Sequence, residues 1–341
     1  MRFAVLAASA VSCSLLVAGL LPPSALAEEK LRISLETAPN HIRNLTVGRF
    51  AEDVMKRVPA LKVEIFHSAQ LHPDRDVPKA LRQGTIEMGV PGAWQIDKIE
   101  PNAAIVDLPA FYGLPEDAAH GLLEGEIGRK LNSLFERKLQ VKIPGAWLPL
   151  GFGNTFTTGK ELKVTGDFKG MKIRIPGGAI NIDRYKAFGA NAVLVPWPDV
   201  PLALSQGAVE GLYTTFESVR SAQLWDAGVK YAYVERVAVL PYIPMIGLGF
   251  WNRQKPEVQE HLLAAWKDAV TWGRANARLR EQEAMKLAEE KGIKVFRPRQ
   301  EDLDTARRAL LAIQPDLVRK MGLDPQIVDE IVAELKKAGA V

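Results

Sequence analysis

The sequence predicts an α/β protein that is large enough for two domains. A strand, a helix and a second strand follow one another near the start, an order that favours a parallel sheet with right-handed crossovers. The chain has 341 residues, of which 47% are hydrophobic and 25% charged, a composition typical of a folded globular protein. A long helical pattern begins at residue 256 and ends near residue 291. A straight helix of that extent would be roughly 54 Å long, which exceeds one small domain.

Residues 1–27 have the features of a secretory signal peptide. Arg2 supplies a short positive start, Ala4 to Leu21 is apolar, and Ala25-Leu26-Ala27 is a small-x-small cleavage site. A membrane anchor is the alternative, but prolines and not a cluster of charges follow the apolar run. The single cysteine, Cys13, lies inside this segment and lacks the neighbours of a lipoprotein site. We therefore expect an exported mature protein without cysteine, and hence without disulfides or cysteine-metal sites.

The first part of the mature chain alternates between strand and helix patterns. Apolar and polar side chains alternate with a period of two in the expected strands and recur with helical spacing in the segments between them. Trp94 follows Pro91-Gly92 at the carboxyl end of one such strand, where it is expected to form a pocket wall, with a lid over the core as the alternative. The expected elements are strands at 31–35, 61–66 and 86–90 and helices at 42–58 and 76–83.

A short strand that carries an arginine is the candidate centre of a binding site. Residues 171–175 alternate apolar and basic side chains, and Pro176-Gly177-Gly178 ends the strand. Arg174 therefore lies near the carboxyl end of a strand, the edge at which ligands bind in open α/β sheets. Its planar guanidinium can donate two parallel hydrogen bonds to a carboxylate. An exposed arginine that pairs with a surface acid is the alternative, with equal weight on this pattern alone.

The second part of the chain continues the alternation and ends in helices. Pro256 in the first turn and Gly292 just past the end are the expected punctuation of one long helix, with two helices broken near Gly273 as the alternative. Residues 301–340 predict two amphipathic helices separated at residues 322–325. The other expected elements are helices at 181–188 and 200–206 and strands at 192–195 and 209–214.

Several kinds of chemistry lack a signal in this sequence. Lysine and arginine total 44 against 40 acidic residues and are scattered, which disfavours nucleic acid as a partner. The five histidines form no metal-binding spacing, so we expect no metal site, although carboxylates and carbonyls could still bind calcium or sodium. Gly151 to Asn154 lacks the third glycine of a dinucleotide motif, so no cofactor is expected. An enzyme remains a weak alternative, because a catalytic Ser, His and Asp can be close in the fold while distant in the sequence.

Residues 167–177, Asp-Phe-Lys-Gly-Met-Lys-Ile-Arg-Ile-Pro-Gly, resemble the arginine-bearing strand of the DctP family, the solute-binding proteins of tripartite ATP-independent periplasmic (TRAP) transporters. Each matching motif is weak by itself, but the ordered set is specific and covers nearly the whole mature chain. The other segments that resemble the family, in order, are 69–76, 80–88, 107–111, 188–193 and 203–211.

The resemblance implies a two-lobed periplasmic binding protein with a hinge and a long helix spanning both lobes. Lobe I would comprise residues 28–150, with about 240–275 returning to it, and lobe II residues 151–239, with about 276–341 packing mainly on it. It also implies a monomeric, non-enzymatic protein of the periplasm that captures a small organic acid and delivers it to a small and a large integral membrane subunit. The alternatives are a solute-binding protein of another transporter class for a neutral or aromatic ligand, or a periplasmic enzyme.

The resemblance also implies where the ligand binds. The family commonly has a second arginine where this chain has Gly153, so we expect Arg174 to be the only cationic contact and one carboxylate to be favoured over two. Asn154 and Thr155 would replace the missing arginine with neutral hydrogen bonds. Thr214 stands where an asparagine ligand is common.

The remaining site candidates are aromatic or acidic. Trp197 lies between two prolines and is expected to close over the ligand, with a proline-aromatic cluster that stiffens a loop as the alternative. Trp94 and Phe216 are expected to pack on the body of the ligand. Glu217 ends the segment 210–217, where the family often has Asp-Gly-x-Glu-Asn, and Asp74 lies in the loop after the second strand.

Overall fold

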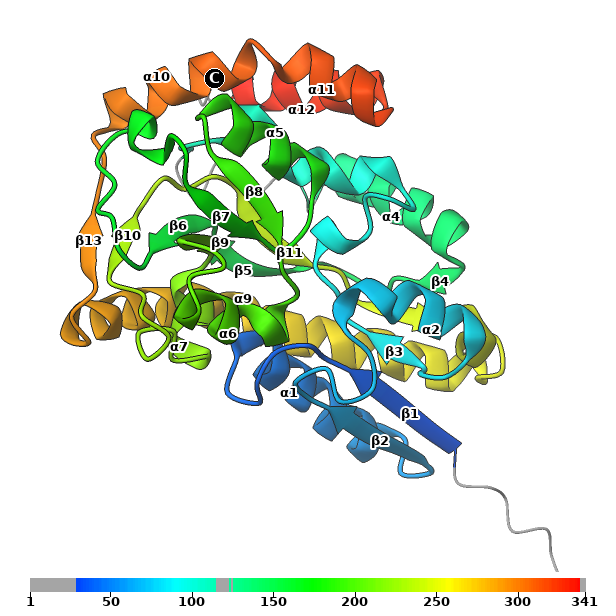
Figure 1. The fold of residues 1–341 in the computed structure, drawn as a ribbon. Coiled ribbons are helices and arrows are strands. Elements are labelled where there is room, and N and C mark those ends of the chain that lie inside the picture. Colours follow the sequence, from blue (N-terminus) through cyan, green and yellow to red (C-terminus); the bar gives the residue numbers. More distant parts are fainter. Residues whose placement is uncertain (1–28, 115–122, 124, 338–341) are drawn as a thin grey trace, which may run out of the picture.

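A computed structural model describes residues 29–114, 123 and 125–337, so the predicted signal peptide lies outside the described residues. Two mixed sheets lie side by side, and one long helix extends from one to the other (Figure 1). We call the part built on the first sheet lobe I and the part built on the second sheet lobe II. The two-lobed α/β architecture expected from the sequence is confirmed.

The sheet of lobe I begins with the β-α-β unit that the sequence predicts. β1 pairs in parallel with β2 and with β3, while β12, which comes from much later in the chain, is antiparallel to β3 and β4. Leu31 and Ile33 of β1 are fully buried and Arg32 between them is not, which is the period-two pattern that defined the strand. Its elements are β1 (Glu29–Ser34), α1 (Ile42–Arg57), β2 (Leu61–Phe66), α2 (Val77–Gln83), β3 (Met88–Gly89), α4 (Glu126–Leu139), β4 (Val141–Lys142), β12 (Met245–Gly247) and α8 (Leu248–Trp251).

The sheet of lobe II has the strand order β13-β10-β6-β9-β7-β8. β7, the arginine-bearing strand, is parallel to both neighbours, β8 and β9, so its carboxyl end opens at the same edge as theirs. The elements of this lobe are β6 (Asn154–Thr157), β7 (Lys172–Ile175), α5 (Ala179–Ala187), β8 (Asn191–Leu194), α6 (Val200–Ser205), β9 (Gly211–Thr214), α7 (Phe216–Ser221), β10 (Tyr231–Tyr233) and β13 (Lys294–Phe296).

Two antiparallel strands carry the chain between the lobes. β5 (Leu148–Phe152) leads from lobe I into lobe II, and β11 (Val239–Tyr242) leads back. They pair with each other outside the two larger sheets. This pair, together with the long helix, connects the lobes in the way a hinge requires.

The long helix α9 (Pro256–Glu290) is one unbroken helix of 35 residues. The alternative of a break near Gly273 is therefore wrong. Gly273 instead permits a close approach, because a Cβ atom there would lie 2.5 Å from Oγ1 of Thr46 on α1 and 2.8 Å from a methyl of Leu148 on β5. α9 packs on α1 of lobe I and on α7 of lobe II, so it spans both lobes (Figure 1).

The described part of the chain ends in three helices, not the two that the sequence predicts from residue 301. The missed break lies after Leu311, where Pro315 in the first turn of the next helix lacks the amide hydrogen that a continuous helix would need. The last helix also contacts the α4 side of lobe I through an ion pair between Lys130 and Glu330, so packing on lobe II describes only part of this segment. The three helices are α10 (Gln300–Leu311), α11 (Gln314–Met321) and α12 (Pro325–Lys337).

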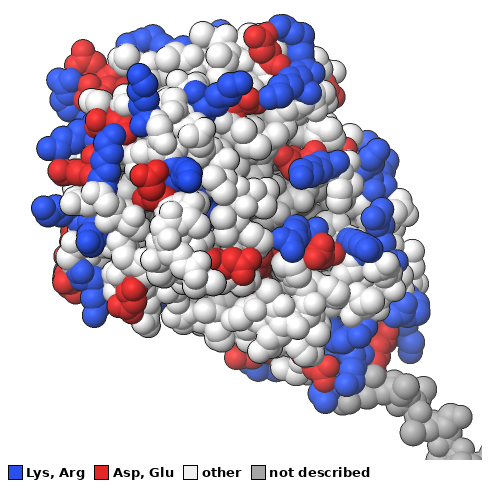
Figure 2. Space-filling view, viewed as in Figure 1, with Lys and Arg blue, Asp and Glu red and all other residues white. Residues whose placement is uncertain are grey.

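The charge distribution on the surface and the hydropathy of the helices also bear on the kind of protein. On the face shown in Figure 2, basic and acidic side chains are interspersed, and no stripe of one sign crosses it. Within residues 29–337, apart from those not described, no helix is both long and apolar enough to cross a bilayer.

Candidate functional site

A narrow cleft lies where the loops of the two lobes meet. Its volume is about 20 Å³, close to the room that one water molecule needs. The lobes are in direct contact beside it: Nε2 of Gln95 donates to the carbonyl of Pro176 at 3.1 Å, and the amide of Ala179 donates to Asp97 at 2.9 Å. The molecule is therefore in a closed arrangement. The cleft is lined by Glu36, Thr37, Trp94, Leu150, Arg174, Pro176, Trp197, Tyr213, Thr214, Ser218, Leu240 and Tyr242.

Arg174 lies in this cleft, at the carboxyl end of β7, where the sequence places it. Its side chain is only 2% exposed. Nε donates to the carbonyl of Val195 at 2.9 Å, Nη1 lies 3.4 Å from the carbonyl of Tyr213, and the guanidinium lies 5.4 Å from the ring centre of Trp197. Burial lowers the pKa of Arg174 to about 10, which still leaves it charged at neutral pH.

The buried arginines elsewhere in the described structure have carboxylate partners, and Arg174 has none. Arg43 lies 2.6 Å from Asp74, and Arg184 lies 3.4 Å from Glu235. No described carboxylate lies within 4.0 Å of the Arg174 guanidinium, a distance that would make an ion pair. A buried charge without a counter-ion is costly, so this arginine is poised to receive an anion from outside the chain.

Glu36 faces the same cleft from lobe I and was not among the candidates from the sequence. It is the second residue after the end of β1 and is only 8% exposed. Burial, and then the neighbouring charge of Asp74, raise the pKa of the Glu36 carboxyl to about 7. The signal that could have found it is simple: Leu31 to Leu35 reads as a strand, and Glu36 is the first acid past its carboxyl end.

Four aromatic residues, Trp94, Trp197, Tyr213 and Tyr242, form part of the remaining wall. Trp94 and Tyr242 pack with ring centres 5.5 Å apart, and the Arg43 guanidinium lies 4.2 Å from the ring centre of Tyr242, which holds that ring in place. Gly177 of lobe II approaches Trp94 so closely that a Cβ atom would lie 2.7 Å from the Trp94 carbonyl. The structure thus brings together four of the predicted site residues, which are Arg174, Trp94, Trp197 and Thr214.

Two predicted polar contacts are engaged elsewhere. Asn154 donates to the carbonyl of Phe152 at 3.0 Å and accepts from the amide of Arg236 at 3.1 Å. The hydroxyl of Thr155 donates to Glu235 at 2.5 Å and lies 2.7 Å from the hydroxyl of Tyr185. Neither side chain lines the cleft, because each satisfies a buried group of lobe II.

Three other candidates also have structural partners away from the cleft. The ring of Phe216 packs edge-on against Phe156 at 4.8 Å, inside the smaller core of lobe II. Asp74 is the partner of Arg43 described above. Glu217 of lobe II accepts from the amide of Ile42 in lobe I at 3.0 Å, and it also pairs with arginines of α7 and α9. Glu217 therefore joins the lobes and does not line the cleft.

The ring of Tyr213 takes the space where the family resemblance places a second arginine. A Cβ atom on Gly153 would lie 2.3 Å from this ring, so no side chain fits at position 153 while the ring is there. Tyr213 itself lines the cleft, and its hydroxyl has no hydrogen-bond partner within the described residues. The cleft thus has an aromatic wall on this side in place of a cation.

A serine and a histidine do meet at the cleft, but their geometry opposes catalysis. Nε2 of His41 lies 3.3 Å from Oγ of Ser218. Nδ1 of His41 accepts a hydrogen bond from the amide of Arg43, so in the neutral ring the proton is on Nε2. The ring therefore donates to Ser218 and cannot take its proton. Burial and the charge of Arg43 also lower the pKa of His41.

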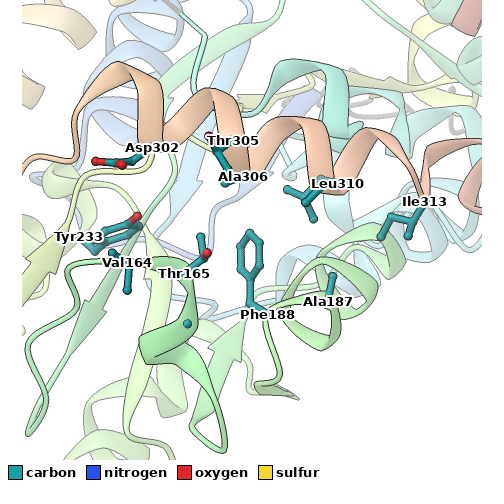
Figure 3. Close-up of a pocket in the computed structure, with 12 residues that line it drawn as sticks. Val164, Thr165, Ala187, Phe188, Tyr233, Asp302, Thr305, Ala306, Leu310 and Ile313 are labelled. Carbon is teal, nitrogen blue, oxygen red and sulfur yellow. The ribbon is translucent and has the colours of Figure 1, made fainter.

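A larger hollow, of about 660 Å³, lies between α5 and α10 (Figure 3). Phe188 from the end of α5 and Leu310 from α10 point into it from opposite sides. Its acid, Asp302, is already paired with Arg299 at 2.8 Å. This hollow therefore offers apolar surface but no buried charge that lacks a partner. Among the described residues no cluster of three His, Cys, Asp or Glu side chains is placed to hold a metal ion.

Comparison with known proteins places this geometry among solute-binding proteins. The profile of "Bacterial extracellular solute-binding protein, family 7" (DctP) matches residues 33–320. The chain is 26% identical over 291 residues to the 2,3-diketo-L-gulonate-binding periplasmic protein YiaO of Escherichia coli, covering 84% of this chain and 87% of YiaO.

Two solved structures show the same fold. One is the sugar acid binding protein DctPAm from Advenella mimigardefordensis in complex with galactonate, with a TM-score of 0.85 and 22% identity, covering 91% of this chain and 98% of that one. The other is a TRAP periplasmic solute-binding protein from Ralstonia eutropha with bound (S)-2-acetolactate, with a TM-score of 0.83 and 25% identity, covering 90% and 99%.

Proposed function

Because the chain belongs to the DctP family of bacterial extracellular solute-binding proteins, we propose that it captures a small organic acid in the interlobe cleft and delivers it to a TRAP transporter. The observation that carries this proposal is Arg174, a buried cation that faces the cleft without a counter-ion. A ligand carboxylate would supply the missing charge and accept hydrogen bonds from the planar guanidinium.

The ligands of relatives support an acid as the solute. The proteins compared above are described with 2,3-diketo-L-gulonate, galactonate and 2-acetolactate, and each of these is a carboxylate. The carboxylate would bind to lobe II through Arg174, while lobe I closes over the rest of the molecule. Water is then excluded, and the ion pair gains strength from the low local dielectric.

The wider setting of the protein is part of the same proposal. The mature chain is a monomer of the periplasm that releases its solute to a small and a large integral membrane subunit. It binds the solute without a cofactor or a metal ion and does not transform it. The protonation of His41 at Nε2, which leaves Ser218 without a base, favours binding over catalysis.

A thermal-shift screen of organic acids with the purified mature protein tests the proposal. An acid that binds only the folded protein raises the melting temperature by mass action, by several degrees at a concentration one hundred times Kd. We expect such an acid, recovered unchanged by mass spectrometry after incubation, and no loss of the shift with a chelator. No shift from any carboxylate, or a product that accumulates in proportion to protein concentration, would contradict the proposal.

A further inference from the structure

We propose that Glu36 determines the specificity of the cleft: it accepts a hydrogen bond from the far end of the ligand and so selects monocarboxylates that carry a hydroxyl or protonated amine. It would reject dicarboxylates. This inference rests on the proposed function, since it requires a ligand carboxylate at Arg174. It adds a polar contact on the opposite lobe, at a residue that was not among the candidates from the sequence.

The carboxylate of Glu36 has no hydrogen-bond or ion-pair partner among the described residues. The residue is nevertheless only 8% exposed. Every other buried carboxylate of the described residues accepts at least one hydrogen bond. The partners are Arg43 for Asp74, Arg32 for Glu87, Ala179 for Asp97, Asn102 for Glu100, Asn181 for Asp107, Arg220 for Glu217 and Thr155 for Glu235.

Glu36 and Arg174 lie on opposite lobes of the same narrow cleft, Glu36 on lobe I and Arg174 on lobe II. Each stabilises the charge of the other, but they do not reach the 4.0 Å of an ion pair. Two opposite charges that face one cleft without touching leave each available to a ligand bound between them. Such a ligand is negative at one end and donates hydrogen bonds at the other.

The charges around the cleft disfavour a second carboxylate on the ligand. A second carboxylate at the far end of a ligand would face Glu36 and, behind it, Asp74, whose charge already disfavours ionisation of Glu36. Two carboxylates that face each other in a buried site repel, and this repulsion opposes binding. A second carboxylate would also find no cation at position 153, because the ring of Tyr213 leaves no room for an arginine there.

Calorimetric titration at pH 8.5 with matched acids tests the inference. The first set is butanoate, 4-hydroxybutanoate, 4-aminobutanoate and succinate, which share a four-carbon chain and differ only at the far end. The second pair is galactonate and galactarate. Galactonate has a terminal hydroxymethyl group where galactarate has a second carboxylate. For the wild type we expect the donor-bearing monocarboxylates to bind at least tenfold more tightly than the matched dicarboxylates.

Glu36→Gln should change this preference without abolishing binding, because the amide keeps the shape and one acceptor oxygen. We expect the ratio of monocarboxylate to dicarboxylate affinity to fall at least tenfold. If the wild type binds 4-aminobutanoate most tightly and Glu36→Gln lowers that affinity more than tenfold, the selected donor is an amine. If the wild type binds 4-hydroxybutanoate or galactonate more tightly than 4-aminobutanoate, the selected donor is a hydroxyl. Glu64→Gln is the control, since Glu64 is on the surface of the same lobe and pairs with Lys30.

The outcomes separate this inference from the proposed function. If Arg174→Ala abolishes binding of every acid while Glu36→Gln leaves the affinity ratio within twofold of wild type, the role of Glu36 is wrong and the carboxylate site stands. If Arg174→Ala binds the acids as the wild type does, the proposed function itself is wrong. A wild type that prefers succinate or galactarate to the matched monocarboxylates would also overturn the inference.

Discussion

Arg43, Arg174 and Arg184 are buried to a similar degree but are neutralised differently. Arg43 and Arg184 have carboxylates of the same chain beside them, which makes them part of the folded framework. Among the described residues, Arg174 has no carboxylate in contact with it, and Glu36, across the cleft, has no cation in contact with it. Natural sequences tolerate such local conflicts mainly at functional sites, where a ligand resolves them. The two side chains therefore make the protein less stable without its ligand than it would be with neutral residues in their places.

The pH dependence of stability tests the cost of burying Glu36. Its pKa is about 7 in the folded protein against about 4.5 when exposed, so the folded protein binds this proton more tightly than the unfolded chain. Stability from this group is fully present below pH 4.5 and is lost as pH rises to 7. The charged groups that face it are Asp74, Arg43, Arg174 and Arg75.

We therefore expect the wild type to lose about 1–3 kcal/mol of unfolding free energy relative to Glu36→Gln between pH 5 and pH 8. Urea denaturation of both proteins at each pH measures this difference. Comparison with the variant removes the contribution of Asp107, whose pKa burial also raises to about 7. Parallel pH profiles for the wild type and the variant would contradict the assignment.

At the scale of elements, α9 is the part that ties the two lobes together. Its middle passes so close to α1 and β5 that only glycine fits at position 273. Gly48 on α1 provides a contrast, because a Cβ atom there would have no atom within 4 Å. Intrinsic helix propensity alone favours alanine over glycine by about 1 kcal/mol at both positions.

The two glycines should respond to alanine in opposite ways. Gly48→Ala should stabilise the protein by up to about 1 kcal/mol, as propensity predicts. Gly273→Ala should destabilise it by about 1–3 kcal/mol, because the added methyl group overlaps Thr46 and Leu148. Adding Thr46→Ala should recover part of that loss. Denaturant unfolding measures all three, and a Gly273→Ala variant as stable as Gly48→Ala would contradict the tight packing.

The elements were easier to predict from the sequence than the site. Periodicity identified the strands around Leu31, Leu61 and Arg174 and the long helix, because each repeats its pattern over several residues. The break after Leu311 was missed because an amphipathic pattern continues across it. Within the site, the end of β7 located Arg174 correctly. Glu235, the partner of Thr155, and Arg236, one of the two partners of Asn154, lie 80 and 82 residues away in the sequence, so no local pattern could show that these side chains were already engaged.

At the scale of the whole molecule, the closed arrangement depends on contacts between the lobes. Glu217 on α7 accepts from the amide of Ile42 at the start of α1 and pairs with Arg280 of α9 at 3.2 Å. His41 and Ser218 lie 3.3 Å apart at the same junction. Of the residues that make these contacts, only Ser218 lines the cleft. These contacts set the population of the closed state, and the apparent affinity of a ligand scales with that population.

Glu217→Gln should therefore weaken ligand binding without a change in the cleft. The amide cannot neutralise Arg220 and Arg280, so the closed state loses an ion-pair network that is buried on the Glu217 side. We expect Kd to rise about three- to thirtyfold, which corresponds to about 0.7–2 kcal/mol, with the same ranking of ligands. Small-angle X-ray scattering without ligand should show a larger radius of gyration. Unchanged affinity and radius would show that Glu217 is not part of the closure.

We expect the Arg174 guanidinium to bind the ligand carboxylate inside the closed cleft. Calorimetric titration of wild type, Arg174→Ala and Arg174→Lys with the best acid of the screen tests this expectation most directly, with circular dichroism to confirm that each variant is folded. Truncating a desolvated ion pair typically costs about 2–5 kcal/mol, so Arg174→Ala should lose roughly thirty- to several-thousand-fold in affinity. Arg174→Lys should also lose much of the binding, because an ammonium cannot donate two parallel hydrogen bonds. Binding by Arg174→Ala within threefold of the wild type would contradict this expectation and place the carboxylate site elsewhere.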